Sequence, residues 1–74
     1  MNANDVDWKE YRRNLVTDYK NEQIWAMGAA DEDVADIHLD NMRCIEREIE
    51  MIDEGLIEKI FEMHEHEVFE PFKK

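Results

Sequence analysis

The chain has 74 residues, a formal net charge of −11 at pH 7 and a single cysteine. A chain this short forms at most one domain and buries only roughly 60% of its unfolded surface, and one cysteine excludes an intramolecular disulfide. Contact with nucleic-acid phosphates or with anionic lipid needs clustered Lys or Arg, so the charge argues against direct binding of nucleic acid or membrane. We therefore expect stability to come from helix packing, including packing between chains.

The N-terminal region carries neither the basic segment nor the apolar core of a signal peptide. No stretch approaches the roughly 20 apolar residues of a membrane span. The expected location is the cytoplasm.

A first helix is predicted over residues 5–27. Asn4 or Asp5 can cap its N-terminus by accepting hydrogen bonds from free backbone N–H groups. Gly28 can take the left-handed conformation that ends a helix. The apolar residues step by three, four and four and therefore form one stripe, made of Trp8, Tyr11, Leu15 and Tyr19.

A second helix is predicted over residues 32–54. It begins at the run Asp31-Glu32-Asp33, because acidic side chains complement the positive end of the helix dipole. The apolar residues of this helix step by three, four, three and four, which makes two heptads. A free-standing coiled coil needs three or four heptads, so a hairpin that also pairs with a second chain is favoured. The seam of this predicted homodimer, which also serves the core, is Met42, Ile45, Ile49, Ile52 and Leu56.

The apolar spacing changes after Leu56, and Gly55 lies at the change. A kink or a third helix over residues 56–69 is predicted there. A continuous helix stays open, since an isolated glycine costs only about 1 kcal/mol relative to alanine. Pro71 disfavours helical geometry at Glu70, and the last two lysines are expected to be mobile. The predicted fold is thus a single all-α domain, a helical hairpin assembled as a helical-bundle homodimer.

The aromatic residues are concentrated at the two ends of the chain. An antiparallel hairpin brings these two sets together, so we expect most of them to form the core. Trp25 lies next to the predicted turn, where an exposed tryptophan is typical of an interface anchor. The two sets are Trp8, Tyr11, Tyr19 and Trp25, and Phe61, Phe69 and Phe72. Val68, Phe69 and Phe72 are expected to fold back on the core.

Fifteen of the 20 acidic residues lie between Asp31 and Glu70, where there are only three bases. Like charges at helical spacing repel by tenths of a kcal/mol per pair, so the excess of acidic over basic residues indicates that the acidic residues have a function. We predict a face that meets a basic groove or imitates a phosphate backbone, and the alternative is a face that only keeps the protein soluble. The stripe is Asp33, Asp36, Asp40, Glu50, Glu54, Glu58, Glu62 and Glu65, and the predicted partner-binding residues are Asp36, Asp40, Glu50, Glu54, Glu58 and Trp25.

No set of residues predicts catalysis. His64 and His66 are two apart and point in different directions on a helix, so they predict no metal site, and His38 is expected to be a partly buried rim residue. The chain has no serine, and Cys44 lies in mid-helix, away from the helix N-terminus that activates a thiol. We therefore expect a protein that is not an enzyme and uses no cofactor or metal.

In size, charge and composition the chain resembles the small, acidic, cofactor-free helical proteins with which phages and mobile elements block host nucleic-acid enzymes. Anti-CRISPR proteins and other DNA mimics belong to this group. The resemblance rests on no motif and assigns no residue. It implies an inhibitor or regulator that occupies the basic, nucleic-acid-binding surface of a partner protein. The alternative is a structural or assembly subunit with a merely solubilising acidic face.

Overall fold

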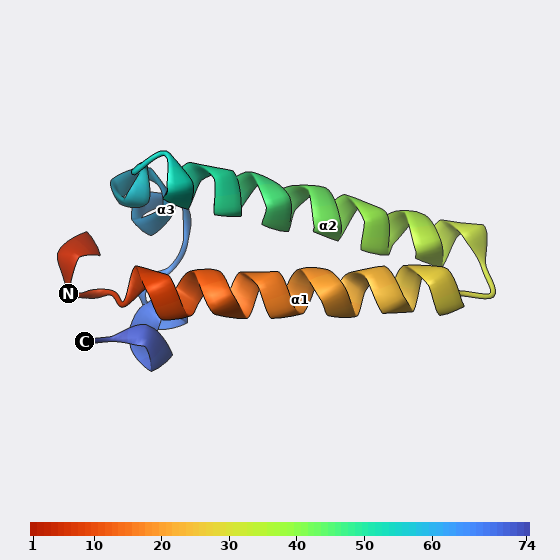
Figure 1. The fold of residues 1–74 in the computed structure, drawn as a ribbon, viewed down its shortest axis with the longest axis horizontal. Coiled ribbons are helices and arrows are strands. Elements are labelled where there is room, and N and C mark those ends of the chain that lie inside the picture. The colour runs from red at the N-terminus through yellow and green to blue at the C-terminus, as the bar shows by residue number, and fades with distance from the viewer.

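The computed structural model describes all 74 residues and is entirely helical apart from short connections. The helices α1 and α2 run antiparallel as a long hairpin, and α3 lies beside the end of α2 (Figure 1). The prediction of an all-α helical hairpin is therefore confirmed. None of the helices combines the length and the apolar composition that crossing a membrane requires. The elements in chain order are the 3-10 helix η1 (Ala3–Asp5), α1 (Trp8–Gly28), α2 (Glu32–Asp53), α3 (Ile57–Met63) and the 3-10 helix η2 (His66–Phe72).

Helix α1 begins after Asp7, whose side chain accepts a hydrogen bond from the Glu10 N–H at 3.2 Å. The expected caps, Asn4 and Asp5, belong instead to η1. This turn has its own cap, because the Asn2 side chain accepts a hydrogen bond from the Asn4 N–H at 3.0 Å. A short 3-10 helix with a cap of its own thus precedes α1, which begins at Trp8 and not at residue 5.

The turn between α1 and α2 does not use a left-handed glycine. Only Gly55 has a positive φ, so the expectation for Gly28 was wrong. Gly28 is the last residue of α1, and Ala29 leaves the helix in an extended conformation. Helix α2 then begins at the predicted acidic run, where the Asp31 side chain caps the helix by accepting a hydrogen bond from the Asp33 N–H at 2.8 Å.

Gly55 ends α2, which settles the choice between a continuous and a broken helix. Its φ is 82°, in the left-handed region. The Gly55 N–H donates to the Ile52 carbonyl at 3.0 Å, and the Leu56 N–H donates to the Met51 carbonyl at 2.9 Å. This pair of hydrogen bonds is the Schellman arrangement, which terminates a helix and lets the chain turn into α3.

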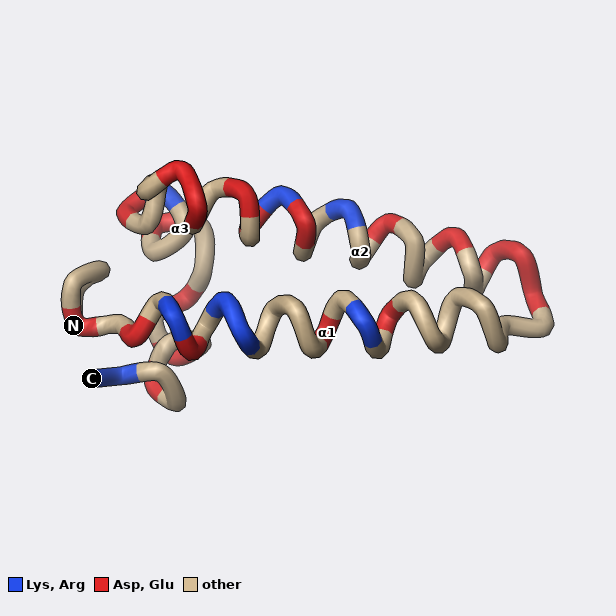
Figure 2. Tube along the Cα trace, in the orientation of Figure 1, with Lys and Arg blue, Asp and Glu red and all other residues tan.

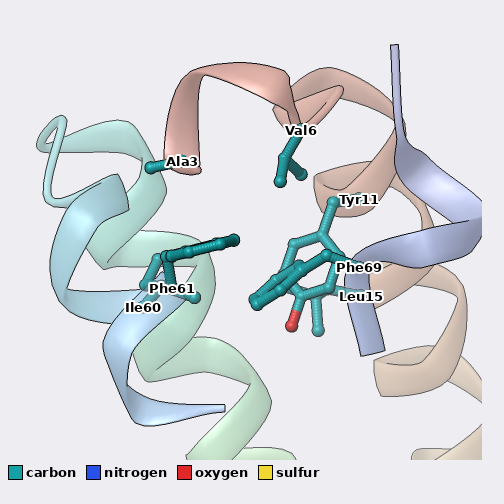
Figure 3. Packing of buried hydrophobic residues seen from close by; sticks show 7 residues of the cluster. All are labelled: Ala3, Val6, Tyr11, Leu15, Ile60, Phe61 and Phe69. Atoms are coloured by element: carbon teal, nitrogen blue, oxygen red, sulfur yellow. The ribbon is translucent and has the colours of Figure 1, made fainter. Parts of the chain in front are cut away.

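The core lies at the end of the hairpin where both termini lie (Figure 1), and Figure 3 shows its seven side chains. Phe69 contacts aromatic rings of α1, with centroids 5.4 Å from Trp8 and 5.2 Å from Tyr11. The two aromatic sets therefore meet only in part, because Tyr19 and Trp25 lie outside the core, and Val68 is exposed. The termini themselves are paired, because the Lys74 N–H donates to the Asp5 carbonyl at 2.8 Å. The buried residues are Ala3, Val6, Tyr11, Leu15, Ile60, Phe61 and Phe69.

The predicted seam is used mainly inside the hairpin. Ile45, Ile49 and Ile52 are partly buried against the core of the same chain. Met42 is half-buried, while Leu56 is 37% exposed. A dimer is not shown by this single chain, and these isoleucines are already in contact with their own core.

Candidate protein-binding surface

Four of the predicted partner-binding carboxylates share the outer face of α2. At about 100° per residue, Asp36, Asp40, Glu50 and Glu54 project to the same side, and all are exposed. Figure 2 shows acidic residues along the whole of α2, whereas basic residues gather near the start of α1. We call these four residues the acidic face.

Two arginines interrupt the acidic face. Arg43 and Arg47 lie on the same side of α2, between the carboxylates near the turn and those near α3. The Arg43 guanidinium lies 3.3 Å from a carboxylate oxygen of Asp40. The pair is exposed, so it contributes little to stability.

Glu58 does not continue the acidic face, because the break at Gly55 places it on α3. Glu58 and Glu62 border a pocket of about 190 Å³ beside Asn2 and Phe61. The stripe expected along one helix and its continuation is therefore divided between two helices. Glu50 and Glu54, by contrast, are brought to a second pocket of about 350 Å³, which is also lined by Arg47, Met51, Leu56, Lys59 and Met63.

Trp25 lies at the opposite end of the hairpin from α3 and is 53% exposed. Its ring centroid is 5.8 Å from that of His38. His38 is partly buried, as expected, and its Nδ1 lies 2.5 Å from a carboxylate oxygen of Glu22. The Asn41 amide donates to the other oxygen of Glu22 at 3.4 Å. Trp25 is therefore flanked by polar groups that hold α1 to α2.

A polar cluster around Glu48 links three helical segments. The Tyr11 hydroxyl donates to Glu48 Oε1 at 3.1 Å, and His64 Nε2 lies 2.6 Å from the same oxygen. Burial of Tyr11, and then the negative charge of Glu48 and its hydrogen bond, raise the pKa of the tyrosine well above its usual range. No local pattern in the sequence indicates this cluster, because its members are far apart in the chain and share no motif.

An ion pair between Arg12 and Asp53 also joins α1 to α2. Two guanidinium nitrogens lie 2.9 and 3.1 Å from the two carboxylate oxygens. The hydrogen bonds from Arg12 hold the pKa of Asp53 below its usual range. Residues 41 positions apart give no local signal in the sequence, so this pair was not foreseen.

His64 and His66 contact different groups. His64 is next to Glu48, whereas the ring of His66 stacks on Phe61 with centroids 4.2 Å apart. No group of three or more His, Cys, Asp or Glu side chains is placed to hold a metal ion.

Comparison with known proteins finds no match among family profiles, curated sequences or solved structures.

Proposed function

We propose that the protein is a small inhibitor or regulator whose acidic face occupies a basic, nucleic-acid-binding surface of a partner protein, as phage-encoded DNA mimics do. The observation that supports this proposal is the unbalanced charge of α2, where all of the acidic side chains except Glu48 are exposed. This helix has eight acidic residues and two arginines, a net charge of −6 with His38 neutral. A charge of one sign on an exposed surface attracts a complementary partner over a distance.

The charge density of α2 sets the kind of partner we expect. Its 22 residues span about 33 Å, so the helix carries one net charge per about 5.5 Å. One DNA strand carries one charge per about 3.4 Å. The charge density of α2 is therefore lower than that of a DNA strand. We expect it to bind a moderately basic groove on the partner, and not a strongly basic channel that encloses a duplex.

Charge reversal tests the proposal. In the triple variant Asp36→Lys, Asp40→Lys and Glu54→Lys, all three side chains are exposed and the fold should persist. Proteins that the wild type captures from an extract of the source cell should not be captured by this variant. Duplex DNA should displace the captured protein, and binding should weaken steeply as salt is raised.

The matched control reverses three other exposed carboxylates in the variant Glu65→Lys, Glu67→Lys and Glu70→Lys, which changes the net charge equally. This control should bind the same partner with only a modest change. Equal binding by the acidic-face variant and the wild type would contradict the proposal. Loss of binding in Trp25→Ala alone, with the oligomeric state of the wild type retained, would instead locate the function at the hairpin turn.

A second candidate, which like the first would act as a homodimer, is a structural or assembly subunit whose acidic face serves only solubility. It is favoured by the apolar side chains exposed at the turn end, including Trp25 and Met27, which is 82% exposed. The isoleucines of the predicted seam already contact their own core, so the homodimer we propose needs a further surface.

A further inference from the structure

The turn end of the hairpin lacks a second layer. None of residues 16–59 is buried, and Figure 1 shows neither α3 nor η2 near this end. A two-helix layer can cover only one side of each helix, so apolar surface remains in water. The exposed large apolar residues of this region are Ile24, Trp25, Met27, Val34, Ile37 and Leu39.

Two pockets on one side of the hairpin meet at Cys44. The pocket toward the turn has a volume of about 240 Å³ and is lined by Asp18, Glu22, Trp25, Asn41, Cys44 and Ile45. The pocket toward α3 has a volume of about 390 Å³ and is lined by Cys44, Arg47, Glu48, Met51, Met63 and His64. We call the two together the Cys44 groove.

We propose that a second copy of this chain covers the Cys44 groove, with a two-fold axis passing beside Cys44. The two pockets lie on opposite sides of Cys44 along α2. Such an axis therefore lays the turn-side pocket of each copy against the α3-side pocket of the other. An interface of this symmetry needs one patch that is complementary to itself.

The two pockets carry groups that suit each other. Trp25 of one copy reaches the second copy's Met51 and Met63, which gives each exposed tryptophan an apolar site. Asp18 and Glu22 of one copy face the second copy's Arg47, and the acidic residue of that pocket, Glu48, is already bonded to Tyr11 and His64 of its own chain. Each contact occurs twice across the axis. This reciprocal match of acid with base and of ring with thioether favours a second copy as the occupant.

The inference rests on the homodimer proposed above and supplies its surface. Asp36, Asp40 and Glu54 do not line the Cys44 groove, so the acidic faces of both copies stay exposed in the dimer. The dimer and the binding of a basic partner can therefore fail independently of each other.

Sedimentation equilibrium under reducing conditions tests the dimer with three single variants. Trp25→Glu and Met63→Glu replace side chains that are 53% and 62% exposed in one chain, so circular dichroism should show an intact fold. Each should weaken dimerisation by about tenfold or more, as loss of an interface anchor does. Met27→Glu, at a position 82% exposed and outside the groove, should leave the dissociation constant unchanged.

Cys44 itself reports the position of the axis, because it is exposed and is the only cysteine. A disulfide forms without backbone movement only when the two Cα atoms are within about 7 Å. Mild oxidation should therefore link wild-type chains rapidly and Trp25→Glu chains slowly. The control Cys44→Ser with Glu46→Cys moves the thiol to another side of α2 and should not form the link.

A wild-type chain that sediments as a monomer would overturn the inference. A dimer that keeps its dissociation constant when Trp25→Glu and Met63→Glu are combined would also overturn it. The Asp36, Asp40 and Glu54 lysine variant should remain dimeric. If that variant dimerises and still binds the partner protein, the proposed function fails while the dimer surface stands.

Discussion

Tyr11 connects the core to the polar cluster on the hairpin. Its ring is 4% exposed, with centroids 5.2 Å from those of Phe69 and Phe72. Its hydroxyl donates to Glu48, which also contacts His64. One side chain therefore joins α1, α2 and η2 through both packing and hydrogen bonding.

Tyr11 should make the folded state sensitive to alkali. Its folded-state pKa is raised, so the folded chain holds a proton that the unfolded chain loses above about pH 10. The free energy of unfolding should therefore fall as pH rises beyond that value. In Tyr11→Phe this alkaline loss should be smaller, and stability at neutral pH should decrease by about 1 kcal/mol for the lost hydrogen bond.

Urea unfolding across the alkaline range measures this effect. Tyr19→Phe is the control, because Tyr19 is only partly buried and lies outside the core cluster. It should retain the full alkaline loss. An identical pH profile for the wild type and Tyr11→Phe would contradict the assignment.

At the scale of the elements, two glycines next to helix ends have different roles. Gly55 has a φ of 82° and makes the turn from α2 into α3, whereas Gly28 does not have a positive φ. A Cβ added at either position would meet no atom within 4 Å. The two glycines therefore differ in backbone conformation, and at neither would an added Cβ clash with a neighbouring atom.

Alanine at the two glycines should change stability in opposite directions. Gly55→Ala forces an L-residue into the left-handed region and should cost about 1–2 kcal/mol. Gly28→Ala keeps an accessible conformation, reduces the freedom of the unfolded chain and should stabilise by about 0.4–1 kcal/mol. Thermal unfolding of the two variants beside the wild type measures both. Destabilisation of equal size in both would show that the turn conformation is not the cause.

On the scale of the whole molecule, packing and charge are unevenly distributed. The chain measures 41 × 20 × 19 Å, and its buried side chains all lie at the end near the termini. Net charge, by contrast, is spread along α2 and α3. The long hairpin thus combines a small core with an extended, self-repelling surface.

Salt should therefore stabilise the fold at neutral pH. Like charges at helical spacing repel, and raising salt from about 0.02 to 0.5 M screens them. The free energy of unfolding should rise by about 1 kcal/mol, the sum of several such pairs. The Asp36, Asp40 and Glu54 lysine variant should be more stable than the wild type at low salt, and its free energy of unfolding should rise less as salt is added. If the free energy of unfolding of the wild type did not change with salt, its carboxylates would be mostly paired, which would contradict this prediction.

The sequence by itself determined the features that depend on neighbours along the chain. Apolar spacing predicted the two long helices, and the acidic run at residues 31–33 predicted where the second one begins. An antiparallel hairpin brings aromatic residues near the two ends of the chain together, as it does Trp8 and Phe69. The exposure of Asp36, Asp40 and Glu54 followed from the same helical period, although their role in binding stays a prediction.

Only the tertiary structure decided which glycine turns left-handed, how α3 leaves α2, and which carboxylates are held by partners. Gly28 and Gly55 look alike as helix breakers, but only Gly55 adopts a positive φ, where the chain turns so that α3 can pack on the core. In the sequence Glu48 resembles its acidic neighbours, but in the folded chain its carboxylate is bonded to Tyr11 and His64. The physical reason is that a hydrogen bond between residues 37 positions apart depends on how the helices pack, which no local spacing encodes.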